Sequence, residues 1–289
     1  MEKYVNCIAH STSEGNLLIG DEFTALIDCG MGFCAQDTMQ MVKRALGGRP
    51  LDYMFLSHTH YDHIGALPFF RMEWGGLKVA TTEVGAAALL KNTPRRVIRE
   101  LSHAAAKNAG ATLDADYDDD LFHANITLKD GEAFPLGGLT VTAIETPGHT
   151  RDSVCYLVPE LELLILCETP GVLLPDGRVY PCYLTSYDDT LKSIGKCRDI
   201  RYRYLTIPHR GIIGEDEAAG IFDKALAANT DCYNLIHGMK RDGLGEDEIV
   251  DKIFREYAND TVFHHHPPEA FMVNMRALVA CTLRGVTTD

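Results

Sequence analysis

The sequence Ser57-His58-Thr59-His60-Tyr61-Asp62-His63-Ile64-Gly65 follows directly on the apolar run Tyr53-Met54-Phe55-Leu56. Three imidazoles and one carboxylate therefore come together at the end of a segment that has the composition of a buried strand. Imidazole nitrogen and carboxylate oxygen are ligands of zinc and similar divalent metals. The alternative is a polar loop with chance histidines, but His-x-His-x-Asp-His at a strand exit is far more specific than a lone His-x-His. The stretch predicts a metal site.

The composition is that of a globular protein with a large core. The chain has 289 residues, 46% of them hydrophobic, and no run approaches the roughly 20 apolar residues that span a bilayer. The N-terminal sequence shows no signal-peptide pattern. Nine cysteines occur singly, without a CxxC pair, which fits reduced thiols. We therefore expect a cytoplasmic location and no membrane association.

The charge balance limits the class of partner. The formal net charge is −14, and affinity for a phosphate backbone needs clustered Lys and Arg. We expect a small-molecule substrate and no nucleic acid, and the sequence leaves a homodimer open.

The first half of the chain alternates strand and helix patterns. Short apolar runs predict a hairpin at 16–20 and 24–30, a helix beginning near Asp37, a buried strand at 51–56, a strand at 78–80, and helices at 83–90 and 94–108. Residues 114–120 form the densest acidic run. We interpret it as a solvated loop, because it lacks the glycine and the closing glutamate of a calcium-binding EF-hand loop.

The second half repeats the order of strand hairpins followed by helix. Strands are predicted at 126–128, 139–144, 154–158, 161–166 and 204–207, and helices at 246–257 and 267–284. The recurrence favours two similar α/β halves. We place them in one catalytic domain, residues 1–215, with residues 216–289 as a helical extension packed on it.

Three further strand ends carry side chains that bind metals. They are His149 in Thr146-Pro147-Gly148-His149-Thr150, Glu168 after Cys167, and His209 in Pro208-His209-Arg210-Gly211. A stack of two sheets brings such strand ends together. The expected groups are His58, His60 and His149 at one metal, Asp62, His63 and His209 at a second, and Glu168 as a bridge.

These segments together resemble the metallo-β-lactamase-fold hydrolases over roughly residues 16–215. HxHxDH is that family's signature, residues 146–150 match its TPGHT segment, Leu26-Ile27-Asp28-Cys29-Gly30 is similar to its strand ending in Asp-x-Gly, and His209 stands where its last His is expected. The resemblance implies a four-layer αβ/βα sandwich, here with added C-terminal helices. It also implies two divalent metal ions, with zinc as the first choice and iron or manganese as alternatives.

One position departs from the family pattern. The family usually places a bridging Asp where this chain has Glu168, whose arm is one methylene longer, so both bridging and binding to a single metal stay open. Cys167 should face the opposite side of its strand as a packed thiol. Asp28 is expected to orient a ligand.

The expected chemistry is hydrolysis. A bound divalent metal lowers the pKa of its water from 15.7 to about 7, and the resulting hydroxide attacks a carbonyl or phosphoryl centre. Asp62 is the candidate to pass a proton to the leaving group. No GxSxG nucleophile motif competes with this interpretation.

The substrate is less determined than the reaction, because the resemblance covers enzymes that open β-lactams, lactones, thioesters and phosphoesters. The helical segment at about 83–110 and the C-terminal helices should shape a pocket for a small acyl compound, so a thioester or lactone is the first choice. Alternatives are phosphodiester hydrolysis, an iron-dependent oxygenase or oxidoreductase on the same fold, and a non-catalytic binding protein. His264, His265 and His266 are expected at the surface, or against the substrate if the C-terminal helices cover the site.

Overall fold

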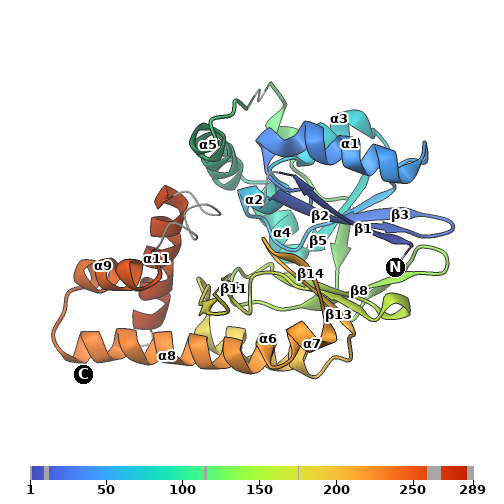
Figure 1. Cartoon of the computed structure of the whole chain (residues 1–289). Helices are drawn as coiled ribbons and strands as arrows, with labels where there is room; N and C mark the ends of the chain where they lie inside the picture. Colours follow the sequence, from blue (N-terminus) through green and yellow to red (C-terminus); the bar gives the residue numbers. More distant parts are fainter. Residues whose placement is uncertain (1, 10–12, 114–115, 175, 259–267, 285–289) are drawn as a thin grey trace.

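Two six-stranded sheets are stacked face to face, with helices on both outer sides (Figure 1). The computed structural model describes residues 2–9, 13–113, 116–174, 176–258 and 268–284. None of the helices in this described part of the chain combines the length and the apolar composition that crossing a membrane requires.

The first sheet follows the order of the chain. Its strands are β1 (Tyr4–Ala9), β2 (Ser13–Ile19), β3 (Thr24–Ile27), β4 (Tyr53–Phe55), β5 (Lys78–Thr82) and β6 (Ile126–Leu128). Strands β1 to β3 are antiparallel, and β3 to β6 run parallel. The parallel strands end at the same edge of the sheet, which is where β4 delivers the HxHxDH stretch.

The second sheet is largely antiparallel. Its order is β14 (Gly211–Gly214), β13 (Tyr204–Ile207), β10 (Leu163–Ile165), β9 (Val154–Val158), β8 (Thr140–Glu145) and β7 (Ala133–Pro135). Only the pair β10 and β13 is parallel among its described pairings. A separate two-stranded ribbon joins β11 (Val172–Leu173) to β12 (Val179–Tyr180).

The helices belong to the outer layers and to the C-terminal region. They are α1 (Ala35–Leu46), α2 (Tyr61–Ile64), α3 (Leu67–Glu73), α4 (Glu83–Leu89), α5 (Asn92–Asn108), α6 (Tyr187–Arg198), α7 (Glu215–Ala218), α8 (Ile221–Arg241), α9 (Glu246–Tyr257) and α11 (Pro268–Leu283). Short 3-10 turns, η1, η2 and η3, occupy Gly32–Cys34, Asp119–Leu121 and Pro159–Leu161.

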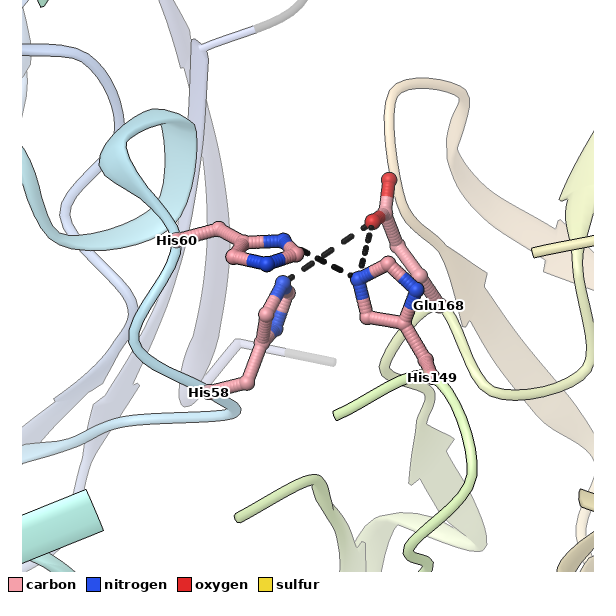
Figure 2. A group of neighbouring side chains, drawn as sticks. All are labelled: His58, His60, His149 and Glu168. Atoms are coloured by element: carbon pink, nitrogen blue, oxygen red, sulfur yellow. Dashed lines mark hydrogen bonds and ion pairs between the residues drawn. The ribbon is translucent and has the colours of Figure 1, made fainter. Parts of the chain in front are cut away.

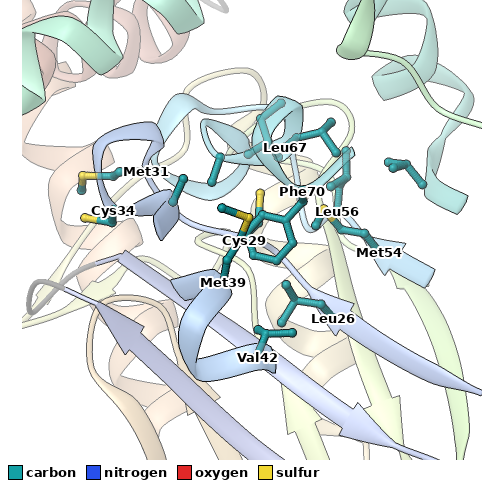
Figure 3. Packing of buried hydrophobic residues seen from close by; sticks show 14 of the residues in the cluster. Leu26, Cys29, Met31, Cys34, Met39, Val42, Met54, Leu56, Leu67 and Phe70 are labelled. Atoms are coloured by element: carbon teal, nitrogen blue, oxygen red, sulfur yellow. The ribbon is translucent and has the colours of Figure 1, made fainter. Parts of the chain in front are cut away.

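Alternation along the central strands produces the layers. Leu26 and Met54 pack with α1 and α3 on the outer side of the first sheet (Figure 3), whereas Ile27 and Phe55 pack against the second sheet. Neighbouring strand residues point to opposite faces, so each strand supplies both layers. Tyr156 of the second sheet meets Phe55, with ring centroids 5.7 Å apart. The predicted four-layer sandwich is confirmed.

The helix predicted near Asp37 is α1, which begins two residues earlier, at Ala35. Asp37 lies in its first turn, and Cys34 is the N-cap because the preceding 3-10 turn leads straight into the helix. The acidic run is the predicted solvated loop where the structure describes it, since Asp116, Asp118 and Asp120 are exposed. Ion pairs of Asp119 with Arg99 and of Asp120 with Arg95 also connect it to α5.

The C-terminal helices form a cluster of their own beside the sandwich. Phe271, Met275 and Leu278 of α11, in the helix predicted at 267–284, are fully buried against α8 and α9. In Figure 1, α11 stands on the same side of the molecule as α5. The boundary near residue 215 stays a prediction.

Candidate metal centre and substrate pocket

The HxHxDH stretch is held in place by the neighbouring strand end. The backbone N–H groups of Cys29 and Gly30 both donate to the carbonyl of His63, at 2.9 and 3.0 Å. His60 has an extended backbone and is the N-cap of the one-turn helix α2, which carries Asp62 and His63. The change from extended to helical backbone after His60 allows the side chains of His58, His60, Asp62 and His63 to point toward a common centre.

The first ligand group combines His58, His60, His149 and Glu168, and their ligand atoms all lie within 4.8 Å of one another. His149 Nε2 lies 3.0 Å from His60 Nδ1 and 2.9 Å from Glu168 Oε2. His58 Nε2 lies 3.8 Å from the same oxygen. Figure 2 shows that His58 and His60 come from one half of the sandwich, and His149 and Glu168 from the other.

The second ligand group combines Asp62, His63, His209 and Glu168, also within 4.8 Å. His209 Nε2 lies 2.8 Å from Glu168 Oε1 and 3.7 Å from Asp62 Oδ2. His63 Nε2 lies 4.0 Å from Asp62 Oδ2. The two carboxylate oxygens of Glu168 therefore face different groups, Oε2 the first and Oε1 the second. All seven residues singled out in the sequence meet at this one place.

The outer ring nitrogens of three ligands are fixed by hydrogen bonds. His63 Nδ1 donates to Asp28 Oδ2 at 2.9 Å, and His149 Nδ1 donates to the carbonyl of Cys182 at 2.7 Å. His58 Nδ1 lies 3.0 Å from Ser57 Oγ. Such contacts set ring orientation and direct Nε2 inward. The Nε2 atoms of His58 and His63 are buried and have no hydrogen-bond partner in the described protein, which fits a bound cation.

The imidazoles of the site differ in proton affinity. Burial, with the neighbouring imidazoles, lowers the pKa of His58 well below its usual range and that of His60 to about 4. Burial also opposes charge on His149, but Cys182 and Glu168 hold its pKa well above its usual value.

The two imidazoles of the second group have raised pKa values. Burial opposes their charge, but Asp62 and Asp28 raise the pKa of His63 to about 9, and Glu168 raises that of His209 to about 10. His58 and His60 can therefore bind a metal without releasing a proton, whereas His63, His149 and His209 must each release one.

Both carboxylates stay ionised despite their burial. Burial by itself would raise the pKa of Asp62 and of Glu168, but the imidazoles around them outweigh it and the pKa of each lies below its usual value. For Glu168 the main opposing influence is His149, followed by His209. Two carboxylates are therefore available to balance the charge of divalent cations.

Residues behind the ligands include one that the sequence did not reveal. Asp28 accepts hydrogen bonds from the Ser57 backbone N–H and from His63, as expected of an orienting residue. Glu14 is also buried, and its carboxylate accepts a hydrogen bond from the backbone N–H of His209. Burial raises the pKa of Glu14 to about 7. No motif signalled Glu14, because it reaches the site only through the pairing of β2 in the first sheet.

Cys167 lies away from the ligands. Its thiol is fully buried and contacts Cys155, Thr146 and Thr169 on the core side of the strand end. The prediction of a packed thiol is confirmed, whereas the Glu168 carboxylate lies among the candidate metal ligands.

A cavity of about 360 Å³ adjoins the ligands. Its floor includes His60, Asp62 and Glu168, and its walls come from α4, α5 and α11. The sequence predicted a pocket shaped by these helical segments, and the structure confirms it. The individual wall residues were not predicted, because nothing local shows which face of a distant helix covers a site. His264, His265 and His266 lie outside the described residues.

The family can now be stated. The model of the metallo-beta-lactamase superfamily matches residues 16–169, more than half of the chain. This chain belongs to that superfamily.

Three relatives show the range within the superfamily. A metallo-beta-lactamase fold-containing protein, ST1585 of Sulfurisphaera tokodaii, is 25% identical over 68% of this chain and 72% of its own length, and its crystal structure superposes with a TM-score of 0.60 over 94% of this chain and 98% of that chain. A coenzyme F420H(2) oxidase of Methanothermobacter marburgensis is 30% identical over 80% of this chain. An atrochrysone carboxyl ACP thioesterase of Aspergillus fumigatus is 24% identical over 47% of this chain. The chain spans 59% of the oxidase and 24% of the thioesterase.

Proposed function

We propose that this superfamily member is a binuclear metal-dependent hydrolase, most suited to zinc, that cleaves a small thioester or lactone. The observation that carries the proposal is the position of Glu168, whose two oxygens face two separate groups of imidazole and carboxylate ligands. A carboxylate in that position suits two cations, because each oxygen serves one of them.

Two bound divalent ions would supply a water of lowered pKa and a Lewis acid for the substrate carbonyl. His58, His60 and His149 would hold the first ion, and Asp62, His63 and His209 the second. Asp62 also borders the cavity. As an ionised carboxylate beside the reacting centre, it can accept the proton that the attacking water loses and deliver it to the leaving group.

The choice of an acyl substrate rests on the pocket and on the relatives. The cavity is small and ends on three of the candidate ligands. In this proposal the bond to be cleaved would lie at these ligands and the rest of the substrate between the helices. A thioesterase is among the relatives. Phosphodiester hydrolysis is less favoured, since the cavity-lining residues in the described part of the chain include no Lys or Arg to hold a phosphate.

A second candidate function is redox chemistry at a di-iron site. It is favoured by the 30% identity to a coenzyme F420H(2) oxidase, and imidazole and carboxylate ligands suit iron as well as zinc. The two candidates differ in measurable ways: the redox function requires stoichiometric iron and oxygen consumption, and the hydrolytic function requires neither.

The proposal is tested with the purified full chain and panels of thioesters, lactones and phosphodiesters. His58→Ala and Asp62→Ala each remove a ligand of a different group, so each should reduce kcat/KM by at least about a thousandfold while the circular dichroism spectrum stays unchanged. His103→Ala, in a helical residue away from both groups, is the control and should retain activity. Near wild-type turnover by both ligand variants would contradict the proposal.

A further inference from the structure

The walls of the cavity beside the ligands are mainly aliphatic, and they indicate what kind of ligand the cavity can bind. Its aliphatic lining consists of Ala88, Val97, Ile98, Leu101, Ala270 and Val273. The first four lie on α4 and α5, and the last two lie on α11, more than 160 residues further along the chain. Two distant segments thus present apolar side chains to one space that opens onto His60, Asp62 and Glu168.

Two of these side chains are exposed although they are apolar. Val97 is 41% exposed and Val273 is 56% exposed. On opposite walls of the same cavity they form apolar surface that the described protein leaves uncovered. Uncovered apolar surface grouped in a hollow is typical of a ligand site rather than of chance exposure.

Among the described lining residues, only those of the floor carry charge. Apart from His60, Asp62 and Glu168, the polar residues of this described lining are Thr59, Tyr61, Thr93 and Asn274, all neutral. A charged group placed between α5 and α11 would lose water and gain no ion partner from these residues. This lining therefore favours a ligand whose part away from the metal ligands is neutral and apolar.

We propose that the space between α5 and α11 binds the aliphatic acyl chain of the substrate, so that the size of this space limits the chain length that is accepted. This inference rests on the proposed hydrolytic function and adds the substrate class to it. The volume of about 360 Å³ lies near the lower end of the range of small-molecule sites. It accommodates a short to medium acyl chain, while a bulky leaving group lies outside the helices.

Binding is tested separately from catalysis with neutral alkyl amides that the enzyme does not need to hydrolyse. Affinities of butanamide, hexanamide and octanamide for the metal-loaded chain are measured by ligand-observed NMR. Each added methylene should tighten binding by about threefold until the cavity is filled. The ω-amino derivative of octanamide should bind at least about tenfold more weakly than octanamide, since its ammonium group finds no partner between the helices.

Two variants fill the cavity and one serves as a matched control. Val97→Phe and Val273→Phe enlarge exposed side chains of opposite walls, so neither should disturb folding. Val84→Phe makes the same change at a valine of α4 that is 47% exposed and does not line the cavity. The two cavity variants should lose at least about tenfold in octanamide affinity, and their best thioester substrate should have a shorter acyl chain. Val84→Phe should match the wild type in both measurements.

The outcomes separate this inference from the proposed function. In one outcome, amide binding depends on chain length and is weakened by Val97→Phe and Val273→Phe, but the protein hydrolyses none of the esters tested. This outcome would support the acyl site and overturn the hydrolytic function. In another outcome, the rate of hydrolysis does not depend on acyl chain length, and both cavity variants have the same amide affinity as Val84→Phe. This outcome would overturn the acyl site without contradicting the hydrolytic function.

Discussion

Glu168 connects the two candidate ligand groups through its two carboxylate oxygens. Its carboxylate spans the space between His149 Nε2 and His209 Nε2, at 2.9 and 2.8 Å from Oε2 and Oε1. An aspartate at the same backbone position ends one methylene earlier. The sequence alone did not decide between bridging and binding to a single metal. That choice depends on how far the carboxylate lies from His149 and His209, and the sequence does not give these distances.

Asp28 offers a test of ligand orientation with little disturbance of the backbone. Its φ is 59°, in the left-handed region that Asn tolerates, and Asn retains an oxygen for the Ser57 N–H. Asp28→Asn should therefore leave the fold intact but remove the charge that holds His63. We expect metal affinity to fall by about 10- to 100-fold, measured by competition with a chromophoric chelator.

The control for Asp28 is Asp21→Asn. Asp21 is an exposed residue paired with Lys3, and the same chemical change there should leave metal affinity unaltered. Equal affinity in Asp28→Asn and the wild type would show that His63 needs no support from this carboxylate.

At the scale of elements, the loop that carries His149 depends on close packing against α6. Gly148 has a φ of +144°, and a Cβ added there would lie 2.7 Å from Thr190 Cα. The carbonyl of Gly148 also accepts hydrogen bonds from the Thr185 backbone and side chain. A side chain at position 148 would push the loop away from the helix and move His149.

Gly148→Ala should lower the free energy of unfolding by about 2–4 kcal/mol and weaken metal binding, through backbone strain and the steric clash. Gly195→Ala is the matched control. Gly195 lies on α6 with open space around its Cα, so alanine should raise stability by up to about 1 kcal/mol. Urea unfolding measures both, and a Gly148→Ala curve that coincides with the wild type would contradict the packing argument.

Some strands and helices could be predicted from the sequence, and others could not. Strands β3 and β4 were predictable because strong apolar runs end in distinctive motifs. Strands β1, β7 and β14, and helix α6, carry weak local patterns and were not predicted. The ligands were found because each directly follows a strand. Glu14 and Val273 were not found, because strand pairing and the return of α11 across the site are tertiary events without a local signal.

At the scale of the whole molecule, the site couples metal binding to pH. The pKa values of His63 and His209 are raised from 6.5 to about 9 and about 10. In the metal-free protein, their contribution to stability is fully present below about pH 6.5 and is lost as pH rises through 9 and 10. An imidazole binds a metal only in its neutral form, so metal affinity changes in the opposite sense and rises over the same range.

The metal-free protein should accordingly show a melting temperature that falls between about pH 7 and pH 10, whereas its affinity for zinc increases. At neutral pH, zinc binding should release about three protons, from His63, His149 and His209, because the pKa of each is raised above neutral pH. Calorimetric titrations in buffers of different ionisation enthalpy count these protons. A binding enthalpy independent of the buffer would contradict the assignment of charge to these three imidazoles.

The architecture of the whole chain places one buried centre between the two sheets. Each sheet supplies part of each ligand group, so neither half can bind two metals alone. The sequence predicted this arrangement through the spacing of its motifs and the family resemblance. It did not predict which helix faces enclose the substrate.

The most direct test is the metal content of the full chain beside that of Glu168→Asp and Glu168→Ala, measured by inductively coupled plasma mass spectrometry after loading and desalting. A two-metal hydrolytic centre predicts about two zinc ions per wild-type chain, metal retained in Glu168→Asp, and loss of at least one ion in Glu168→Ala. Metal content unchanged in Glu168→Ala would contradict the bridge, and stoichiometric iron with oxygen consumption by the wild type would contradict the hydrolytic function.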